Sequence, residues 1–416
     1  MFHPKIWFHI LKITRLNCNF EVEFNGAKME INELKIRREG VIKRMKQEGI
    51  DACLISSNTN IIYLSGLLYS GYLYLNCNGD VIHFVKRPNN LQLSDPILFI
   101  RKPEEIPNLL KEKNQPIGET IALEEDEMSY SDRIRVSQIF PDKTIKNCSS
   151  IIRAARAIKT EYELKLFRIA AQKQSDAIRE FPKLFRLGMT DNEFAIEMEY
   201  EIRKRGSIGV VRVFGESMEI FMGSVLTGEN AATPSAFDFA LGGAGLNPTI
   251  PVGHNNTPLN EGQTVMVDIC GNFNGYHSDQ TRVFSVGKTS QKALYAHQVS
   301  IEILNTIKEM GKEGVACCEL YEKAIEIVKQ HNLTDCFMGA TQKASFIGHG
   351  VGLVLNELPV LTAKNKSPLT AGMTIAIEPK FIIDKIGAVG NEDTFAVRKN
   401  QAMEQLTNAP EEIIVL

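Results

Sequence analysis

The sequence predicts an α+β protein in which a smaller α/β domain precedes a larger domain built on paired strands. Helical and strand-forming segments alternate from residue 30 to about Cys148. Capping boxes at Thr160 and Thr190 then begin two helices, and a strand–turn–strand pattern runs from Val265 to Phe284. At 416 residues, the chain is long enough for each part to bury its own core.

The first predicted domain covers residues 29–150. Residues 30–47 form an amphipathic pattern that predicts a helix, which Gly49 ends. The apolar runs at 51–56 and 61–64 predict strands, and residues 73–85 predict a hairpin about Asn78-Gly79. No glycine-rich phosphate loop interrupts this alternation, which is typical of an α/β domain.

Residues 1–28 lack the periodicity of a helix or a strand. The apolar run at 6–11 is short, contains His9 and has no small-residue cleavage site, so a signal peptide is poorly supported. We expect residues 1–28 to be either a loose, disordered extension or sequence upstream of the natural start. No later run approaches the ~18 uncharged apolar residues of a membrane span.

Charge and cysteine content indicate the cell compartment and exclude some partners. The net charge of -3 predicts neither a nucleic-acid partner nor a membrane surface. The eight cysteines are scattered without a CxxC pair, which favours reduced thiols in the cytoplasm over a disulfide framework.

The second predicted domain covers residues 158–416. Its first helix should end or kink at Pro182, and its second should run from Thr190 to about Lys204. The Gly- and Pro-rich residues 205–260 predict long loops between strands. Two further helices are expected at 291–310 and 318–331.

The segment from Val265 to Phe284 carries two carboxylates that need a partner. A buried apolar strand ends in Asp268, a turn follows at Asn274-Gly275, and the returning strand bears Asp279. A hairpin would bring the two aspartates together, and they would repel unless a cation lies between them. A twelve-residue calcium loop fits poorly, because Phe273 stands where that loop needs glycine. Two surface aspartates near a turn are the other alternative.

Three more ligand-type side chains follow in the C-terminal third. His349 lies in the sequence GHGVG, Glu378 ends the apolar run 373–377, and Glu392 precedes a strand. Together with the two aspartates they would suit two divalent ions that share oxygen ligands. Such ions lie ~3.5–4 Å apart and lower the pKa of a bridging water toward ~7.

The order Asp, Asp, His, Glu, Glu resembles the pita-bread metallopeptidases, which include methionine aminopeptidase, aminopeptidase P, prolidase and creatinase. The motifs are VMVDICGNFNGYHSDQTRVF, GHGVG, AIEPK and NEDT, and the resemblance covers residues 158–416. The preceding α/β region resembles the N-terminal domain of the creatinase, prolidase and aminopeptidase P branch. The resemblance therefore implies a pita-bread catalytic domain after a creatinase-like one.

The resemblance also implies a role for each ligand. Asp268 would hold one ion and His349 and Glu378 the other, while Asp279 and Glu392 would bridge both. A hydroxide between the ions would attack the scissile carbonyl, and Glu378 would relay its proton to the leaving amine. The ions would be Mn²⁺, with Co²⁺, Zn²⁺ or Fe²⁺ as alternatives.

Three positions depart from the family pattern. Asn356 stands seven residues after His349, where relatives carry a second histidine, and is expected to bind the substrate carbonyl. His254 is the only candidate for an upstream catalytic histidine, although the ungapped position is Pro251. Gly390 replaces an arginine that is frequent in the family.

The resemblance implies a homodimeric peptidase that removes an N-terminal residue before proline or splits Xaa-Pro dipeptides, and the cysteine usage predicts a cytoplasmic location. The departures keep open a creatinase-like or lyase-like enzyme that acts on a small non-peptide substrate. A non-catalytic binding module on the same fold is a third hypothesis, which the complete ligand set argues against.

Overall fold

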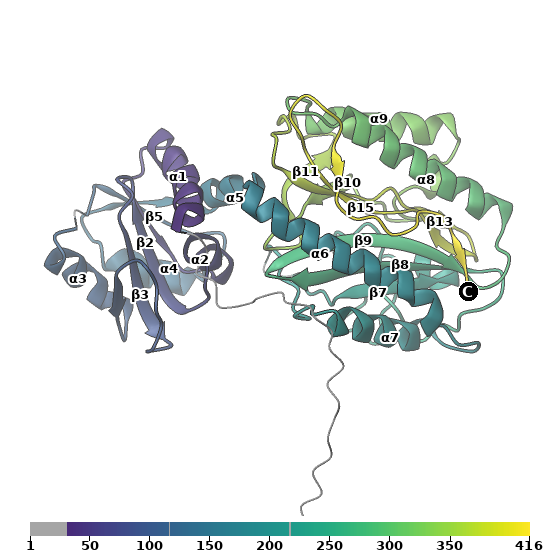
Figure 1. The fold of residues 1–416 in the computed structure, drawn as a ribbon, viewed down its shortest axis with the longest axis horizontal. Coiled ribbons are helices and arrows are strands. Elements are labelled where there is room, and N and C mark those ends of the chain that lie inside the picture. The colour runs from purple at the N-terminus through teal and green to yellow at the C-terminus, as the bar shows by residue number, and fades with distance from the viewer. Residues whose placement is uncertain (1–30, 116, 216–217) are drawn as a thin grey trace, which may run out of the picture.

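The computed structural model describes residues 31–115, 117–215 and 218–416, which form two lobes joined by a pair of helices (Figure 1). The predicted extension at 1–28 lies outside the described residues. The N-terminal lobe contains α1 (Ile31–Gln47), β1 (Ala52–Ile55), α2 (Asn58–Ser65), β2 (Ser70–Asn76), β3 (Val81–Arg87), β4 (Ile97–Phe99), α3 (Ile106–Glu112), β5 (Thr120–Leu123), α4 (Tyr130–Gln138) and β6 (Thr144–Asn147). The connecting helices are α5 (Ser149–Ala157) and α6 (Glu161–Glu180).

The C-terminal lobe contains the remaining elements. They are α7 (Asp191–Lys204), β7 (Gly223–Thr227), β8 (Thr264–Phe273), β9 (Tyr276–Ser285), α8 (Gln291–Met310), α9 (Cys317–Gln330), β10 (Phe346–Gly350), β11 (Glu357–Thr362), β12 (Thr374–Ile377), β13 (Phe381–Ile383), β14 (Gly387–Val389), β15 (Asp393–Ala396), β16 (Glu404–Gln405) and β17 (Ile414–Val415).

The N-terminal lobe is built on one six-stranded sheet with the order β4-β3-β2-β1-β5-β6. The predicted hairpin is confirmed: β2 and β3 pair antiparallel, and Gly79 takes a φ of 97° in the turn. The prediction of a strand at 61–64 is wrong, because those residues lie in α2. The Ser57 hydroxyl caps that helix, and its apolar side chains are buried against the sheet.

Two sheets form the frame of the C-terminal lobe. One has the order β17-β9-β8-β7 and the other β11-β10-β12-β15-β16. Helices α6 and α7 pack against the first sheet, and α8 and α9 lie beside the second (Figure 1). Both predicted capping boxes are present, and α6 ends at Glu180, two residues before Pro182.

A buried ion cluster fastens the connecting segment to the C-terminal lobe. Arg156 and Lys159 each contact the Glu357 carboxylate, at 2.7 and 3.0 Å, and all three side chains are buried. Arg156 also donates a hydrogen bond of 2.8 Å to Asn60 of the N-terminal lobe. The two lobes are therefore coupled through charged groups at the edge of β11.

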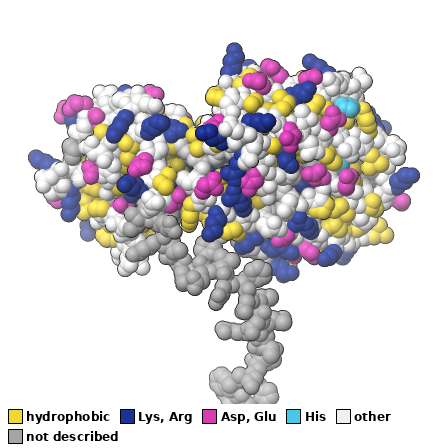
Figure 2. Space-filling view, turned by 45° about the horizontal axis from the view of Figure 1, so that its top comes forward, with side chains coloured by type: hydrophobic (Ala, Val, Ile, Leu, Met, Phe, Trp, Pro, Cys, Tyr) yellow, Lys and Arg dark blue, Asp and Glu magenta, His cyan; other side chains and the backbone are white. Residues whose placement is uncertain are grey.

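The surface carries mixed charge. On the face shown in Figure 2, basic and acidic side chains are interspersed over both lobes, in agreement with the small net charge. Among the described residues, no helix is long and apolar enough to cross a membrane.

Candidate metal centre

The β8–β9 hairpin supplies the first two ligand-type side chains. Its turn is formed by Asn274 and Gly275, both with positive φ, as expected for a tight hairpin. Asp268 pairs with Thr281, and Cys270 pairs with Asp279. Since side chains two residues apart share a face of a strand, this register puts the two aspartates diagonally on the same face.

The second sheet supplies the other three. His349 lies on β10, Glu378 directly follows β12, and Glu392 directly precedes β15. These three strands are neighbours in the sheet, so their ends meet at one place. Backbone hydrogen bonds of 3.2 and 3.3 Å between Glu392 and Thr281 then tie this edge to β9.

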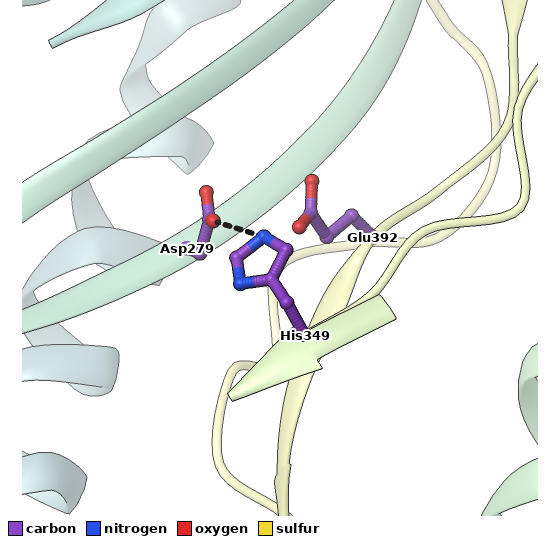
Figure 3. Close-up of side chains that lie close together, drawn as sticks. All are labelled: Asp279, His349 and Glu392. Atoms are coloured by element: carbon purple, nitrogen blue, oxygen red, sulfur yellow. Dashed lines mark ion pairs between the residues drawn. The ribbon is translucent and has the colours of Figure 1, made fainter. Parts of the chain in front are cut away.

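The two sheets bring the predicted ligands together. Figure 3 shows Asp279, His349 and Glu392 pointing toward one another from opposite sides of the site. The Nε2 atom of His349 lies 3.7 Å from Asp279 Oδ2 and 3.5 Å from Glu378 Oε1. Two groups could hold a cation, with ligand atoms within 4.8 Å of one another: Asp279 with His349 and Glu392, and Asp268 with Glu378 and Glu392.

The first of these groups has free electron pairs where a cation would need them. The Nδ1 atom of His349 lies 3.0 Å from the Gly350 carbonyl, which assigns the proton to Nδ1 and leaves Nε2 as an acceptor. Glu392 Oε1 is buried without a hydrogen-bond partner, whereas its Oε2 accepts from the Thr281 hydroxyl at 2.7 Å. The donor set therefore fits a divalent ion.

The second group already contains a cation, which the sequence analysis missed. The Nζ atom of Lys380 lies 2.7 Å from Asp268 Oδ2, 2.7 Å from Glu378 Oε2 and 3.3 Å from Glu392 Oε2. Its side chain is fully buried. A sequence signal existed, because Lys380 interrupts a mostly apolar segment from residue 373 to residue 383.

Burial and mutual repulsion dominate the electrostatics of the site. Burial, followed by the charges of Asp268 and Glu378, raises the pKa of Asp279 well above its usual value. Burial and then the charges of Asp279 and Glu378 do the same to the pKa of Glu392. Burial acts to lower the pKa of Lys380, but the surrounding carboxylates outweigh it and raise the pKa overall. The site thus attracts positive charge.

A cavity of about 230 Å³ opens onto these groups. All five predicted ligands line it, and its remaining walls are mostly apolar, including Phe221, Phe239 and Leu241. Apolar walls around a few convergent polar groups are typical of a site that binds a small molecule or the end of a peptide.

Comparison with known proteins identifies the family of this chain. Residues 165–399 match the model of metallopeptidase family M24, and residues 37–158 match that of the creatinase/prolidase N-terminal domain. The first match alone spans more than half of the chain. The chain belongs to metallopeptidase family M24.

Individual relatives agree with this assignment. The Xaa-Pro dipeptidase of Pyrococcus furiosus is 26% identical over 387 residues, which cover 92% of this chain and 100% of the relative. The solved X-Pro aminopeptidase of Thermotoga maritima has a TM-score of 0.75 at 24% identity, covering 91% of this chain and 99% of that one. The Xaa-Pro dipeptidase from Bacillus anthracis has a TM-score of 0.76 at 22% identity, covering 92% and 100%. The predicted fold class, a pita-bread domain after a creatinase-like domain, is confirmed.

Asn356 and His254 stand at positions that depart from the family pattern, and the structure shows what surrounds each of them. Asn356 lines the cavity, but its amide accepts from the Phe214 N–H at 2.7 Å and donates to the Phe214 carbonyl at 2.9 Å. His254 is buried beside the Phe221 ring, with an unpartnered Nδ1 and a pKa lowered by burial. The substrate role of Asn356 and the catalytic role of His254 stay predictions.

Gly390 shows why no arginine is found at its position. Its φ is 129°, and a Cβ added here would lie 2.2 Å from the Pro379 carbonyl oxygen and 2.9 Å from Lys380 Cα. The backbone that presents Lys380 therefore packs directly on Gly390. In this M24 chain, the residue that supplies a cation to the site is Lys380.

Proposed function

We propose that the protein is a metal-dependent exopeptidase of the Xaa-Pro type, which removes an N-terminal residue before proline or splits Xaa-Pro dipeptides. The convergence of five ligand-type side chains on one cavity is the observation that carries this proposal. Relatives named Xaa-Pro dipeptidase, which align over almost the whole chain, support the substrate class.

The group formed by Asp279, His349 and Glu392 would hold a divalent ion. Its two carboxylates and one imidazole suit Mn²⁺, with Co²⁺, Zn²⁺ or Fe²⁺ as alternatives. When bound, the ion would act as a Lewis acid on the scissile carbonyl and lower the pKa of a water molecule. The family resemblance implies a second ion, but the Lys380 ammonium lies among Asp268, Glu378 and Glu392, which form the second group able to hold one.

The chain's own side chains would handle the proton and the substrate. We assign to Glu378 the transfer of a proton from the attacking water to the leaving amine, since the carboxylate lies between His349 and Lys380. The apolar cavity walls would exclude water from the reacting carbonyl. Asn356 lines the cavity and would hold the backbone of Phe214, which is next to the cavity residue Val213. We keep its contact with the substrate carbonyl as a prediction.

The proposal also covers the domain boundaries, the location and the partners of the protein. We propose domains at 29–150 and 158–416, a cytoplasmic location, and a homodimer with a peptide substrate. No nucleic acid or membrane partner is proposed, which the mixed surface charge supports.

A peptide panel tests the proposed reaction. Protein loaded with Mn²⁺ is incubated with Ala-Pro, Ala-Pro-Ala, Ala-Ala, Ala-Ala-Ala and creatine, and each product is quantified. We expect cleavage of the bond before proline only, and loss of cleavage with a chelator. Turnover of creatine alone would favour the non-peptide enzyme. Absence of any turnover with Mn²⁺, Co²⁺, Zn²⁺ and Fe²⁺ would contradict catalysis altogether.

A further inference from the structure

The Lys380 ammonium lies among the oxygens of one complete ligand group. Its three partners, Asp268, Glu378 and Glu392, are the same three residues that form the second group able to hold a cation. An ammonium has three N–H donors, and here each can meet one carboxylate. The side chain is therefore fully satisfied where it lies.

A divalent ion cannot share this position. Ions of this class bind oxygen at about 2.0–2.6 Å, so an ion bonded to these oxygens would need the space that the ammonium fills. The Nζ atom lies only 2.7 Å from both Asp268 and Glu378. Two positive centres at such short range would also repel strongly in a buried site.

The backbone around Lys380 fixes it in this place. The Met338 N–H donates to the Lys380 carbonyl at 2.8 Å, and Gly390 packs against its Cα. No part of the side chain reaches solvent. Withdrawing the ammonium from its three carboxylates would leave a buried charge without a partner, which is strongly unfavourable. Lys380 is thus a built part of the site, unlike a surface lysine that can swing away.

The first ligand group has no such occupant. Glu392 Oε1 has no hydrogen-bond partner, and the contacts of Lys380 with Glu392 go to Oε2. One ammonium and one divalent ion would together bring three positive charges to four carboxylates, which removes most of their repulsion.

We propose that the Lys380 ammonium permanently takes the place of one of the two divalent ions, so that the protein binds a single ion at Asp279, His349 and Glu392. The inference rests on the metal binding in the proposed function and is independent of its substrate. It makes the chain a mononuclear member of a fold whose ligand set could hold two ions.

Metal stoichiometry tests this inference without reference to activity. Metal-free protein is equilibrated with excess Mn²⁺, freed of unbound ion, and analysed for manganese per chain. Lys380→Met removes the ammonium and keeps most of the aliphatic stem. We expect one ion per chain in the natural protein and two in Lys380→Met. Lys159→Met, which removes another buried ammonium next to a carboxylate, is the matched control and should keep one ion.

The outcomes separate this inference from the proposed function. Equal numbers of bound ions in the natural protein and in Lys380→Met would overturn the inference. If that number is two, the proposed metal dependence still stands. No bound ion in either protein would overturn the proposed metal dependence as well. If Lys380→Met does not fold, anomalous diffraction from the natural protein soaked in Mn²⁺ decides. A single peak beside His349 supports the inference, and a second peak among Asp268, Glu378 and Glu392 overturns it.

Discussion

At the scale of single residues, the site is a cluster of buried anions with one built-in cation. Asp279 and Glu392 have raised pKa values because they are buried near other carboxylates, and Lys380 balances part of that charge. Among the residues that the structure describes, His349 is the one nitrogen ligand in the cluster, and its Nδ1 proton is directed to the Gly350 carbonyl. Metal affinity should therefore depend strongly on His349 and Asp279.

Replacing His349 tests this directly. We expect the His349→Ala protein to bind no ion and to hydrolyse peptide roughly 10³-fold more slowly. The reason is that a bound metal ion contributes several kcal/mol to stabilising the charge of the transition state. Manganese analysis and Ala-Pro hydrolysis on folded protein provide the measurement. His331→Ala is the control, because His331 contacts Tyr295 and does not line the cavity. This substitution should change neither the metal content nor the rate of hydrolysis. Full metal content in His349→Ala would refute the assigned ligand.

The five ligand-type residues could be predicted because each is a polar side chain within or beside a strand-forming segment, and because their order matches one family. Asp268 does not end its strand as predicted, since β8 continues to Phe273. Lys380 also interrupts an apolar segment, but it was missed because it has no place in the ligand order Asp, Asp, His, Glu, Glu. Only the pairing of β10, β12 and β15 with the β8–β9 hairpin brings three carboxylates around its Nζ. Long-range pairing of this kind cannot be read from local periodicity.

At the scale of elements, the segment between α5 and α6 is held to β11 by a buried ion cluster. Glu357 begins β11 and forms an ion pair with both Arg156 and Lys159. It directly follows Asn356, which lines the cavity. The cluster therefore connects the junction of the lobes to the wall of the site.

Neutralising Glu357 should destabilise the protein. Glu357→Gln leaves two buried cations without their carboxylate, and breaking a buried pair of this kind costs about 3–5 kcal/mol. Denaturant unfolding measures the change in free energy of unfolding. Glu161→Gln is the control, because Glu161 is 77% exposed and its ion pair with Arg398 should contribute less than about 1 kcal/mol. Similar effects of the two substitutions would contradict the role assigned to the cluster.

The contribution of Glu357 to the free energy of unfolding should depend on pH. Burial alone would raise the pKa of Glu357, but Arg156 and Lys159 lower it from 4.5 to about 2. Because the folded-state pKa is the lower one, the stabilisation is complete above pH 4.5 and is lost as the pH falls through about 2. The shift corresponds to roughly 3 kcal/mol.

Comparing the natural protein with Glu357→Gln isolates this effect. The raised pKa values of Asp279 and Glu392 act in the opposite direction, but they are present in both proteins and cancel in the difference. The stability gap between the two proteins should narrow between pH 4.5 and pH 2. A gap that stays constant over this range would show that the Glu357 pKa is not depressed.

Helix and strand assignment succeeded where a cap or a turn residue was present. The capping boxes at Thr160 and Thr190 and the Asn78-Gly79 turn gave correct elements. The run at 61–64 failed because four apolar or aromatic residues fit a buried strand and a buried helix equally well. The Ser57 cap and Gly66 at the helix end, with a φ of 79°, are the local signals for α2.

At the scale of the whole molecule, the fold was predictable because the ligand order is specific to one architecture. Two sheets each contribute part of the ligand set, and helices cover them on both sides (Figure 1). The N-terminal lobe contributes none of the five ligands, and its Asn60 contacts Arg156, which in turn contacts Glu357 of the C-terminal lobe. We therefore place the proposed chemistry in the C-terminal lobe, with one ion and Lys380.

Titration of activity against bound metal is the most direct test of this account. Mn²⁺ is added stepwise to metal-free protein, and bound ion and Ala-Pro hydrolysis are measured on the same samples. We expect no hydrolysis without metal, a linear rise of hydrolysis with bound metal, and a plateau when one ion is bound per chain. Hydrolysis in the absence of metal, or hydrolysis that begins only after a second ion binds, would contradict this account.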